Sequence, residues 1–260
     1  MLRSLAVVLA LSASVAAVAH ADDKKYTIAD LKALVGQSSF KEAFLHLGDI
    51  SPSQRNAEWT EVAAAAAGGV LGTIDSEDGT TLALVDEIDR DYPQLLKSPK
   101  YLKPRNELGY KGIQGCFEQT NGYWSSYGLD NCVKLGLRFV DNSGQDRGLA
   151  LKVAKLARKS MNAYSAVPFF KRALGPKDTA ACKDEDLKLA VVAGLGLPPT
   201  YPNAVESKAI MATCWADLHE PVIAAFDADS KSGYIKQNTC DFLMGKKLLS
   251  GLQAKQCTKK

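Results

Sequence analysis

Six cysteines constrain this chain more than any other feature, because covalent cross-links decide which segments must lie together. They stand at positions 116, 132, 182, 214, 240 and 257. An even number of cysteines in an exported protein favours disulfides over free thiols. We therefore expect three disulfides, provided that the chain is exported.

The first residues predict that export. Met1-Leu2-Arg3 is a short positive start, Leu5–Val18 is apolar, and Ala19-His20-Ala21 is a small-residue cleavage site. We expect a signal peptide over 1–21 and a mature chain over 22–260, located in a bacterial periplasm or secreted. No later segment approaches the roughly 20 apolar residues needed to span a bilayer, so we expect no membrane-spanning segment.

Antiparallel helix hairpins narrow the pairing of the cysteines, because residues equidistant from the turn face each other. Cys182 and Cys214 lie 17 and 15 residues from a turn centred near Pro199, and Cys116 and Cys132 flank a glycine-bounded loop almost symmetrically. Both pairs suit the short α-carbon separation of a disulfide. Cys240 and Cys257 then pair by elimination, which requires the tail to fold back after Gly251.

Metal binding is the rival interpretation of the cysteines, and the spacing argues against it. A zinc site needs closely spaced thiolates or nearby histidines, whereas the mature chain has no C-x-x-C and only His46 and His219. Residues 227–238 partly resemble an EF-hand loop, but Lys231 takes a ligand position and Asn238 replaces the bidentate glutamate. We expect no metal and no cofactor.

Helix signals recur along the chain, and the alternation typical of strands is nearly absent. Residues 27–30 and 39–42 are capping boxes that precede apolar residues at helical spacing. Residues 51–54 predict a third helix, which runs through Trp59 and ends at Gly68-Gly69. A fourth helix is expected over 78–91, after which prolines at 93, 99 and 104 predict an irregular stretch.

Periodic apolar residues predict the remaining helices over 105–119, 129–141, 145–162, 165–174, 183–195, 203–219, 222–228 and 234–250. Short loops between them imply antiparallel neighbours. The expected fold is all-α, with about a dozen short helices in antiparallel hairpins cross-linked by disulfides. It is either an irregular helical domain or a stack resembling helical repeats, and no linker divides residues 22–260.

Acidic residues cluster between 75 and 91. We expect most of them to be solvated, with Asp86 paired to Arg90 one turn later. Catalytic carboxylate pairs leave no obligatory local spacing, so hydrolysis by two of these groups stays an alternative. The cluster contains Asp75, Glu77, Asp78, Asp86, Glu87, Asp89 and Asp91.

The charge sign reverses between 147 and 177, where basic residues occur without Asp or Glu. Lys152, Lys155 and Lys159 recur at helical spacing and predict a basic face opposite an apolar face that contains Leu151, Ala154 and Leu156. This basic stripe is a solvated face, pairs with the 75–91 cluster, or docks an acidic protein surface or an anionic envelope component. Further candidates for the docking surface are Arg158, Lys171 and Arg172.

An aromatic loop between two cysteines is a second candidate binding element. Tyr123 and Trp124 lie within Gly122–Gly128, where aromatic rings either stack on a sugar, anchor a peptide, or cover the disulfide.

These observations predict a binding or scaffolding protein of the cell envelope or extracellular space. Signal removal leaves 31 basic against 29 acidic residues, a balance that does not favour nucleic acid as a partner. No catalytic residue is identified, so we lean against an enzyme. Two alternatives remain: a hydrolase of envelope polysaccharide or peptide that uses paired carboxylates, and a carrier of a small apolar ligand.

Overall fold

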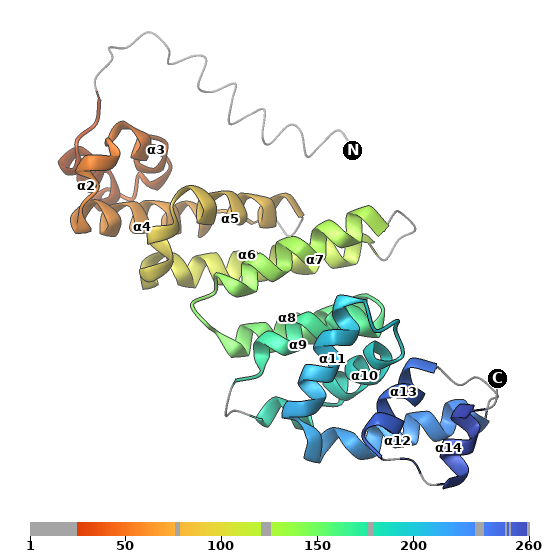
Figure 1. The fold of residues 1–260 in the computed structure, drawn as a ribbon. Helices are drawn as coiled ribbons and strands as arrows, with labels where there is room; N and C mark the ends of the chain where they lie inside the picture. Colours follow the sequence, from red (N-terminus) through yellow and green to blue (C-terminus); the bar gives the residue numbers. More distant parts are fainter. Residues whose placement is uncertain are drawn as a thin grey trace. The chain divides into compact units, whose positions relative to one another are not determined.

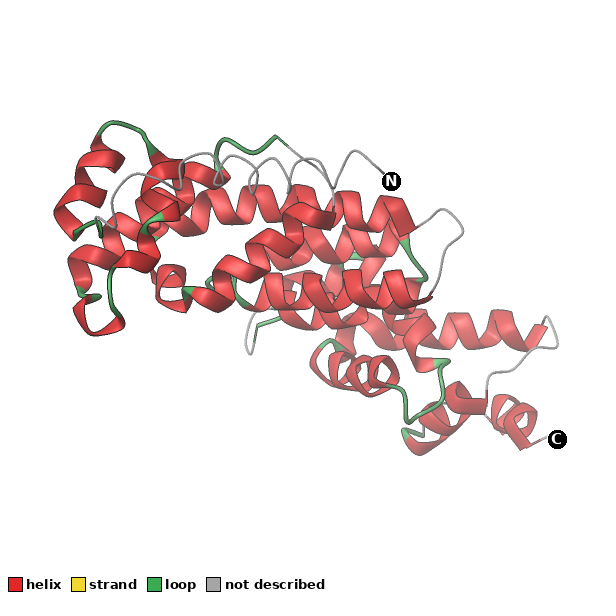
Figure 2. Cartoon of the chain, turned by 90° about the horizontal axis from the view of Figure 1, so that it is seen from above, coloured by secondary structure: helices red, strands yellow, loops and turns green. Residues whose placement is uncertain are grey.

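The computed structural model describes residues 25–75, 79–120, 126–175, 179–231, 237–247, 249 and 251–258. All regular structure in these residues is helical, as Figure 2 shows, which confirms the predicted all-α fold. None of the helices within these ranges has the length and apolarity required to cross a bilayer. The predicted signal peptide over 1–21 lies outside the described residues.

The chain divides into two compact units, one up to Ala66 and one from Ala67 onward. The single domain predicted over 22–260 stays a prediction. Figure 1 labels the α-helices of both units. The first unit contains α2 (Ile28–Gly36), α3 (Phe40–Leu45), η1 (Leu47–Asp49), η2 (Pro52–Gln54) and most of α4 (Ala57–Leu71). The second contains α5 (Gly79–Asp91), η3 (Pro93–Lys97), α6 (Pro99–Thr120), α7 (Ser126–Asp141), α8 (Arg147–Ser160), η4 (Ala163–Ala166), α9 (Val167–Ala173), η5 (Ala180–Lys183), α10 (Glu185–Leu195), α11 (Pro202–Thr213), α12 (Trp215–Lys231), α13 (Gln237–Gly245) and α14 (Gly251–Thr258).

Capping explains where the helices of the first unit begin. The capping box at α2 is confirmed: Asp30 N–H donates to the Thr27 hydroxyl, and Thr27 N–H donates to the Asp30 carboxylate. The box predicted at residues 39–42 is wrong, because the Ser39 side chain makes no capping hydrogen bond. The third helix also begins later than predicted. Pro52–Gln54 is a separate 3₁₀ turn, and Asn56 caps α4 by accepting from the Trp59 N–H at 2.9 Å.

Helix α4 continues past Gly68-Gly69, so the predicted stop there is wrong. The reason is a close helix contact: a Cβ at Gly68 would lie 2.2 Å from the Lys100 carbonyl oxygen of α6. Glycine serves here for close approach and not for termination. The irregular stretch predicted around the prolines is shorter than expected. Pro93–Lys97 is a 3₁₀ turn, but α6 begins at Pro99 and includes Pro104.

Two helices near the C-terminus differ from their predicted bounds. The predicted helix over 203–219 breaks at Cys214, and the predicted helix over 222–228 is part of α12, which carries Pro221 inside it. The predicted helix over 234–250 is shorter, and the chain reverses before Gly251 and not after it. Lys247 takes a positive φ of 57° in this reversal, and α14 then runs back along α13.

The three predicted disulfides are confirmed. Their α-carbon separations are 5.9 Å for Cys116–Cys132, 5.3 Å for Cys182–Cys214 and 5.5 Å for Cys240–Cys257. The first joins α6 to α7, the second joins η5 to the α11–α12 junction, and the third joins α13 to α14. Each bond therefore links segments that pack as neighbours.

The interior of the second unit is built where helices both adjacent and distant in sequence pack on one another. Phe117 of α6 and Phe169 of α9 are fully buried and meet edge to face, with ring centroids 6.1 Å apart. Gly109 lets α7 approach, since a Cβ there would lie 2.1 Å from a ring carbon of Phe139. This packing positions α7 and α9, which both contribute residues to the candidate site.

Candidate functional site

The predicted basic stripe is partly neutralised inside the protein. Lys155 Nζ lies 2.6 Å from Asp184 Oδ2, and Arg172 makes two hydrogen bonds to the Asp141 carboxylate, at 2.5 and 2.9 Å. These bonds raise the pKa of both basic groups. The partners come from neighbouring helices and loops, so the expected pairing with residues 75–91 is wrong for these two side chains.

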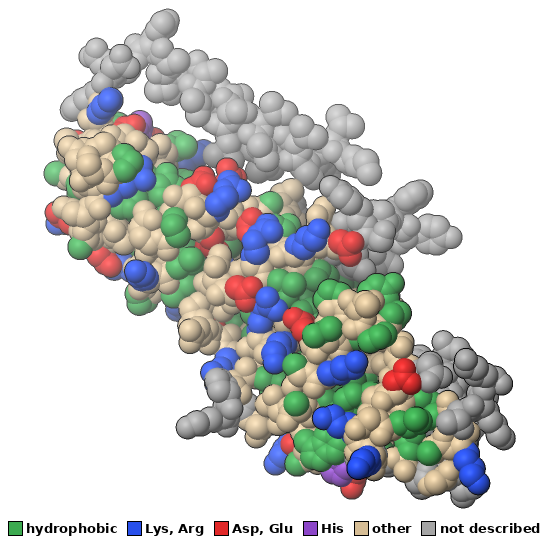
Figure 3. All heavy atoms as spheres, viewed as in Figure 1, with side chains coloured by type: hydrophobic (Ala, Val, Ile, Leu, Met, Phe, Trp, Pro, Cys, Tyr) green, Lys and Arg blue, Asp and Glu red, His purple; other side chains and the backbone are tan. Residues whose placement is uncertain are grey.

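The remaining basic residues lie in different surroundings. Lys152 lines a groove between α6 and α8, Lys159 and Lys171 are exposed, and the Arg158 Nε is buried. On the face in Figure 3, Lys and Arg side chains are scattered among acidic and apolar ones. Of the apolar face predicted for α8, Ala154 is buried, whereas Leu151 and Leu156 are only half-buried. The buried face consists of Leu149, Ala150, Val153, Ala154, Ala157 and Ser160.

The acidic cluster is largely structural. Asp86 pairs with Arg138 of α7 at 2.7 Å, and Arg90 pairs with its neighbour Asp91, so the predicted Asp86–Arg90 pair is wrong. Asp89 is 3% exposed and bonds to the fully buried Arg105. Asp75, Glu87 and Asp91 are exposed, as expected for most of these carboxylates. Glu77 and Asp78 lie outside the described residues.

The other sequence candidates also resolve into structural roles or lie beyond the described part of the chain. Tyr123 and Trp124 belong to the undescribed residues, as do the side chains of 226–236. His46 bonds to Asp49 at 2.9 Å, and His219 stacks on Trp215. No group of three potential metal-ligating side chains occurs among the described residues.

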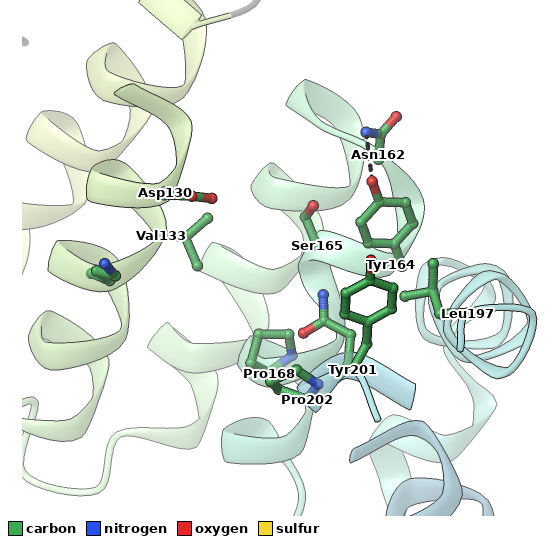
Figure 4. A pocket seen from close by; sticks show the side chains of 11 residues that line it. Asp130, Val133, Asn162, Tyr164, Ser165, Pro168, Leu197, Tyr201 and Pro202 are labelled. Carbon is green, nitrogen blue, oxygen red and sulfur yellow. Dashed lines mark hydrogen bonds between the residues drawn. The ribbon is translucent and has the colours of Figure 1, made fainter. Parts of the chain in front are cut away.

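A cleft of about 910 Å³ among the described residues of the second unit is a candidate ligand site. One wall is the start of α7, and the opposite wall is formed by η4 and the segment that leads into α11 (Figure 4). Its size falls within the roughly 300–1,000 Å³ of small-molecule sites. It is lined by Asp130, Val133, Lys134, Asn162, Tyr164, Ser165, Pro168, Leu197, Tyr201, Pro202 and Asn203.

The starts of α11 and η4 position the polar and aromatic side chains of the cleft. Pro202 is the first residue of α11, which leaves Tyr201 at the cap with extended backbone and its side chain 53% exposed. At the start of η4, Asn162 Nδ2 donates to the Tyr164 hydroxyl at 3.1 Å. Figure 4 shows both tyrosine rings on the wall opposite Asp130 and Val133.

The cleft combines apolar surface with several hydrogen-bonding groups and has no net charge. Asp130 and Lys134 lie one turn apart on α7, and no other charged side chain lines the cleft among the described residues. The Asp130 and Asn203 side chains make no hydrogen bond with another described residue. These groups are therefore free to bond a ligand.

This arrangement suits binding better than acid–base hydrolysis. Hydrolysis by two carboxylates needs a facing pair, whereas Asp130 is the sole carboxylate among the described residues that line the cleft. Glu206 is not part of the lining. Burial raises its pKa, and this effect is larger than the opposite effect of Arg172 and Lys171.

Sequence reasoning missed the cleft because its residues come from four separate segments. Only a weak local signal exists: Asn162-Ala163-Tyr164-Ser165 and Tyr201-Pro202-Asn203 place tyrosine and asparagine between predicted helices. Segments of this kind are common sites of binding residues. Comparisons with protein-family models, with curated proteins and with solved structures found no match to this chain.

Proposed function

We propose that the protein is an exported, disulfide-bonded binding protein of the cell envelope or extracellular space, and that its ligand occupies the cleft beside Tyr164 and Tyr201. The observation that carries this proposal is the cleft itself, which joins exposed aromatic surface to free polar side chains. Export is supported by the composition of residues 1–21 and by the three disulfides.

The two alternatives fit the cleft less well. A carrier of an apolar ligand calls for an enclosed cavity, whereas this cleft opens to solvent. Asp130, Asn162, Ser165 and Asn203 would also lose hydration against such a ligand. A hydrolase lacks its second carboxylate in the described lining. Docking of an acidic or anionic partner stays a prediction, supported now by Lys152 and Lys159 and no longer by Lys155 or Arg172.

Site-specific photo-crosslinking in the native host tests the proposal. A photoreactive phenylalanine analogue replaces Tyr201 in the cleft or, as a control, Trp215, which is 36% exposed and lies outside it. We expect a discrete adduct in the envelope or medium fraction from position 201 and none from position 215. Equal labelling at the two positions, or none at either, would contradict a ligand site in the cleft.

Mass spectrometry of the same material tests export. A mature chain beginning at Asp22 without free thiols is expected, and an uncleaved chain with alkylatable cysteines would contradict the export proposal.

A further inference from the structure

We infer that the cleft binds a neutral oligosaccharide. This inference rests on the proposed function and names the ligand class of the same site. It follows from three properties of the lining: exposed aromatic faces, polar groups that both donate and accept, and the absence of net charge.

The aromatic wall suits the apolar face of a sugar ring. Tyr201 is 53% exposed, and Tyr164 is half-buried beside it. Tyrosine presents a broad apolar face with a polar hydroxyl at its tip, which matches a pyranose with its C–H face on one side and hydroxyls at its edge. The exposed Pro202 extends the apolar surface beside Tyr201, and the buried Pro168 lies next to it in the lining (Figure 4).

The polar groups match hydroxyls because a hydroxyl both donates and accepts. Asp130 supplies acceptors only, whereas the Asn162 and Asn203 carboxamides and the Ser165 hydroxyl supply both kinds of group. The bond from Asn162 to Tyr164 uses one amide hydrogen and leaves the Asn162 carbonyl oxygen and the Tyr164 hydroxyl hydrogen for a ligand. Planar carboxylate and carboxamide groups can each contact two adjacent hydroxyls.

Charge separates a neutral sugar from an anionic polymer. Asp130 and Lys134 contribute one charge of each sign, so the lining has no excess of basic groups to neutralise uronate or phosphate. The basic residues of α8 and α9 line other surfaces or bond to Asp184 and Asp141. An anionic chain would therefore lose hydration in this cleft without gaining an ion-pairing surface.

A proline-rich peptide is the other occupant that aromatic and proline surfaces accept. Its prolines present carbonyl acceptors without N–H donors. Proline carbonyls therefore offer no donor to the Asp130 carboxylate, whereas a sugar hydroxyl does. The mixed donors and acceptors of the lining favour the sugar.

Isothermal titration of the oxidised full chain tests the inference. The probes are neutral tri- to hexasaccharides built from glucose, galactose or N-acetylglucosamine, with trigalacturonate and a proline-rich decapeptide for comparison. We expect at least one neutral probe to bind and to outcompete the other two classes. Tyr201→Ala should weaken that binding at least tenfold and Asp130→Asn at least threefold, whereas Trp215→Ala should change it less than twofold.

Three outcomes would overturn the inference. The first is that no neutral probe binds at concentrations up to about 10 mM. The others are that the uronate or the peptide binds best, or that Tyr201→Ala binds as well as the wild type. Circular dichroism and thiol counts confirm that each variant is folded and oxidised. If crosslinking at position 201 still captures a ligand while the sugars fail, the ligand class is wrong and the binding function stands.

Discussion

Removal of Arg105 should destabilise the second unit strongly, because it would strand a buried carboxylate. Arg105 is fully buried, and its Nε and Nη2 atoms donate to Asp89 at 2.5–3.2 Å. Nη2 also donates to the Phe139 carbonyl at 2.9 Å, and the guanidinium lies 4.4 Å from the Phe139 ring centroid. After Arg105→Met, Asp89 keeps only the donors of Tyr101 and Asn142.

The expected cost is about 3–5 kcal/mol in the free energy of unfolding, the range measured when one partner of a buried ion pair is removed. At about 2–4 °C per kcal/mol for a chain of this size, the melting temperature should fall by roughly 6–20 °C. Urea unfolding of the oxidised protein, followed by far-ultraviolet dichroism, measures the difference. Arg90→Met is the matched control, because Arg90 is an exposed arginine of the neighbouring helix α5 and should cost less than about 0.5 kcal/mol.

A double variant separates the stranded charge from lost packing. Asp89→Leu combined with Arg105→Met removes both charges. The sum of the losses in unfolding free energy of the two single variants should therefore exceed the loss of the double variant by about 2 kcal/mol. An Arg105→Met loss below about 1 kcal/mol, or additive losses in the double variant, would refute the proposed role of the pair.

Three further predictions concern packing, cross-linking and pH. Gly109→Ala should cost about 1–3 kcal/mol, measured by urea unfolding, because its Cβ would lie 2.1 Å from the Phe139 ring; a neutral result would mean that α7 shifts freely. Cys182→Ala with Cys214→Ala opens a loop with a sequence separation of 32 and should lower stability by about 3.7 kcal/mol on loop entropy, again read from urea midpoints. Burial raises the pKa of Glu206 above its ordinary 4.5, so the folded state binds more protons than the unfolded state, and stability should fall as pH rises from about 4.5. Glu206→Gln should remove that part of the pH dependence of thermal unfolding, and an unchanged profile would show that another group is responsible.

Much of the fold follows from local patterns. The all-α fold could be predicted because capping residues and helical spacing act within a few turns, as the Thr27–Asp30 box shows. The cysteine pairs could be predicted because they close short hairpins, where equal distances from a turn bring residues together. Helix bounds were less predictable, since Gly68 and Pro104 act through a contact between α4 and α6 that no local pattern reveals.

The sequence by itself therefore determined the helical class, the disulfide pairing and the approximate order of helices, because these depend on neighbours along the chain. Only the tertiary structure decided which charges pair and where a ligand fits. Asp86 meets Arg138 across 52 positions and Asp141 meets Arg172 across 31, and the cleft joins residues from Asp130 to Asn203. The physical reason is that charge and hydrogen-bonding partners are chosen by proximity in space, and helix packing sets that proximity.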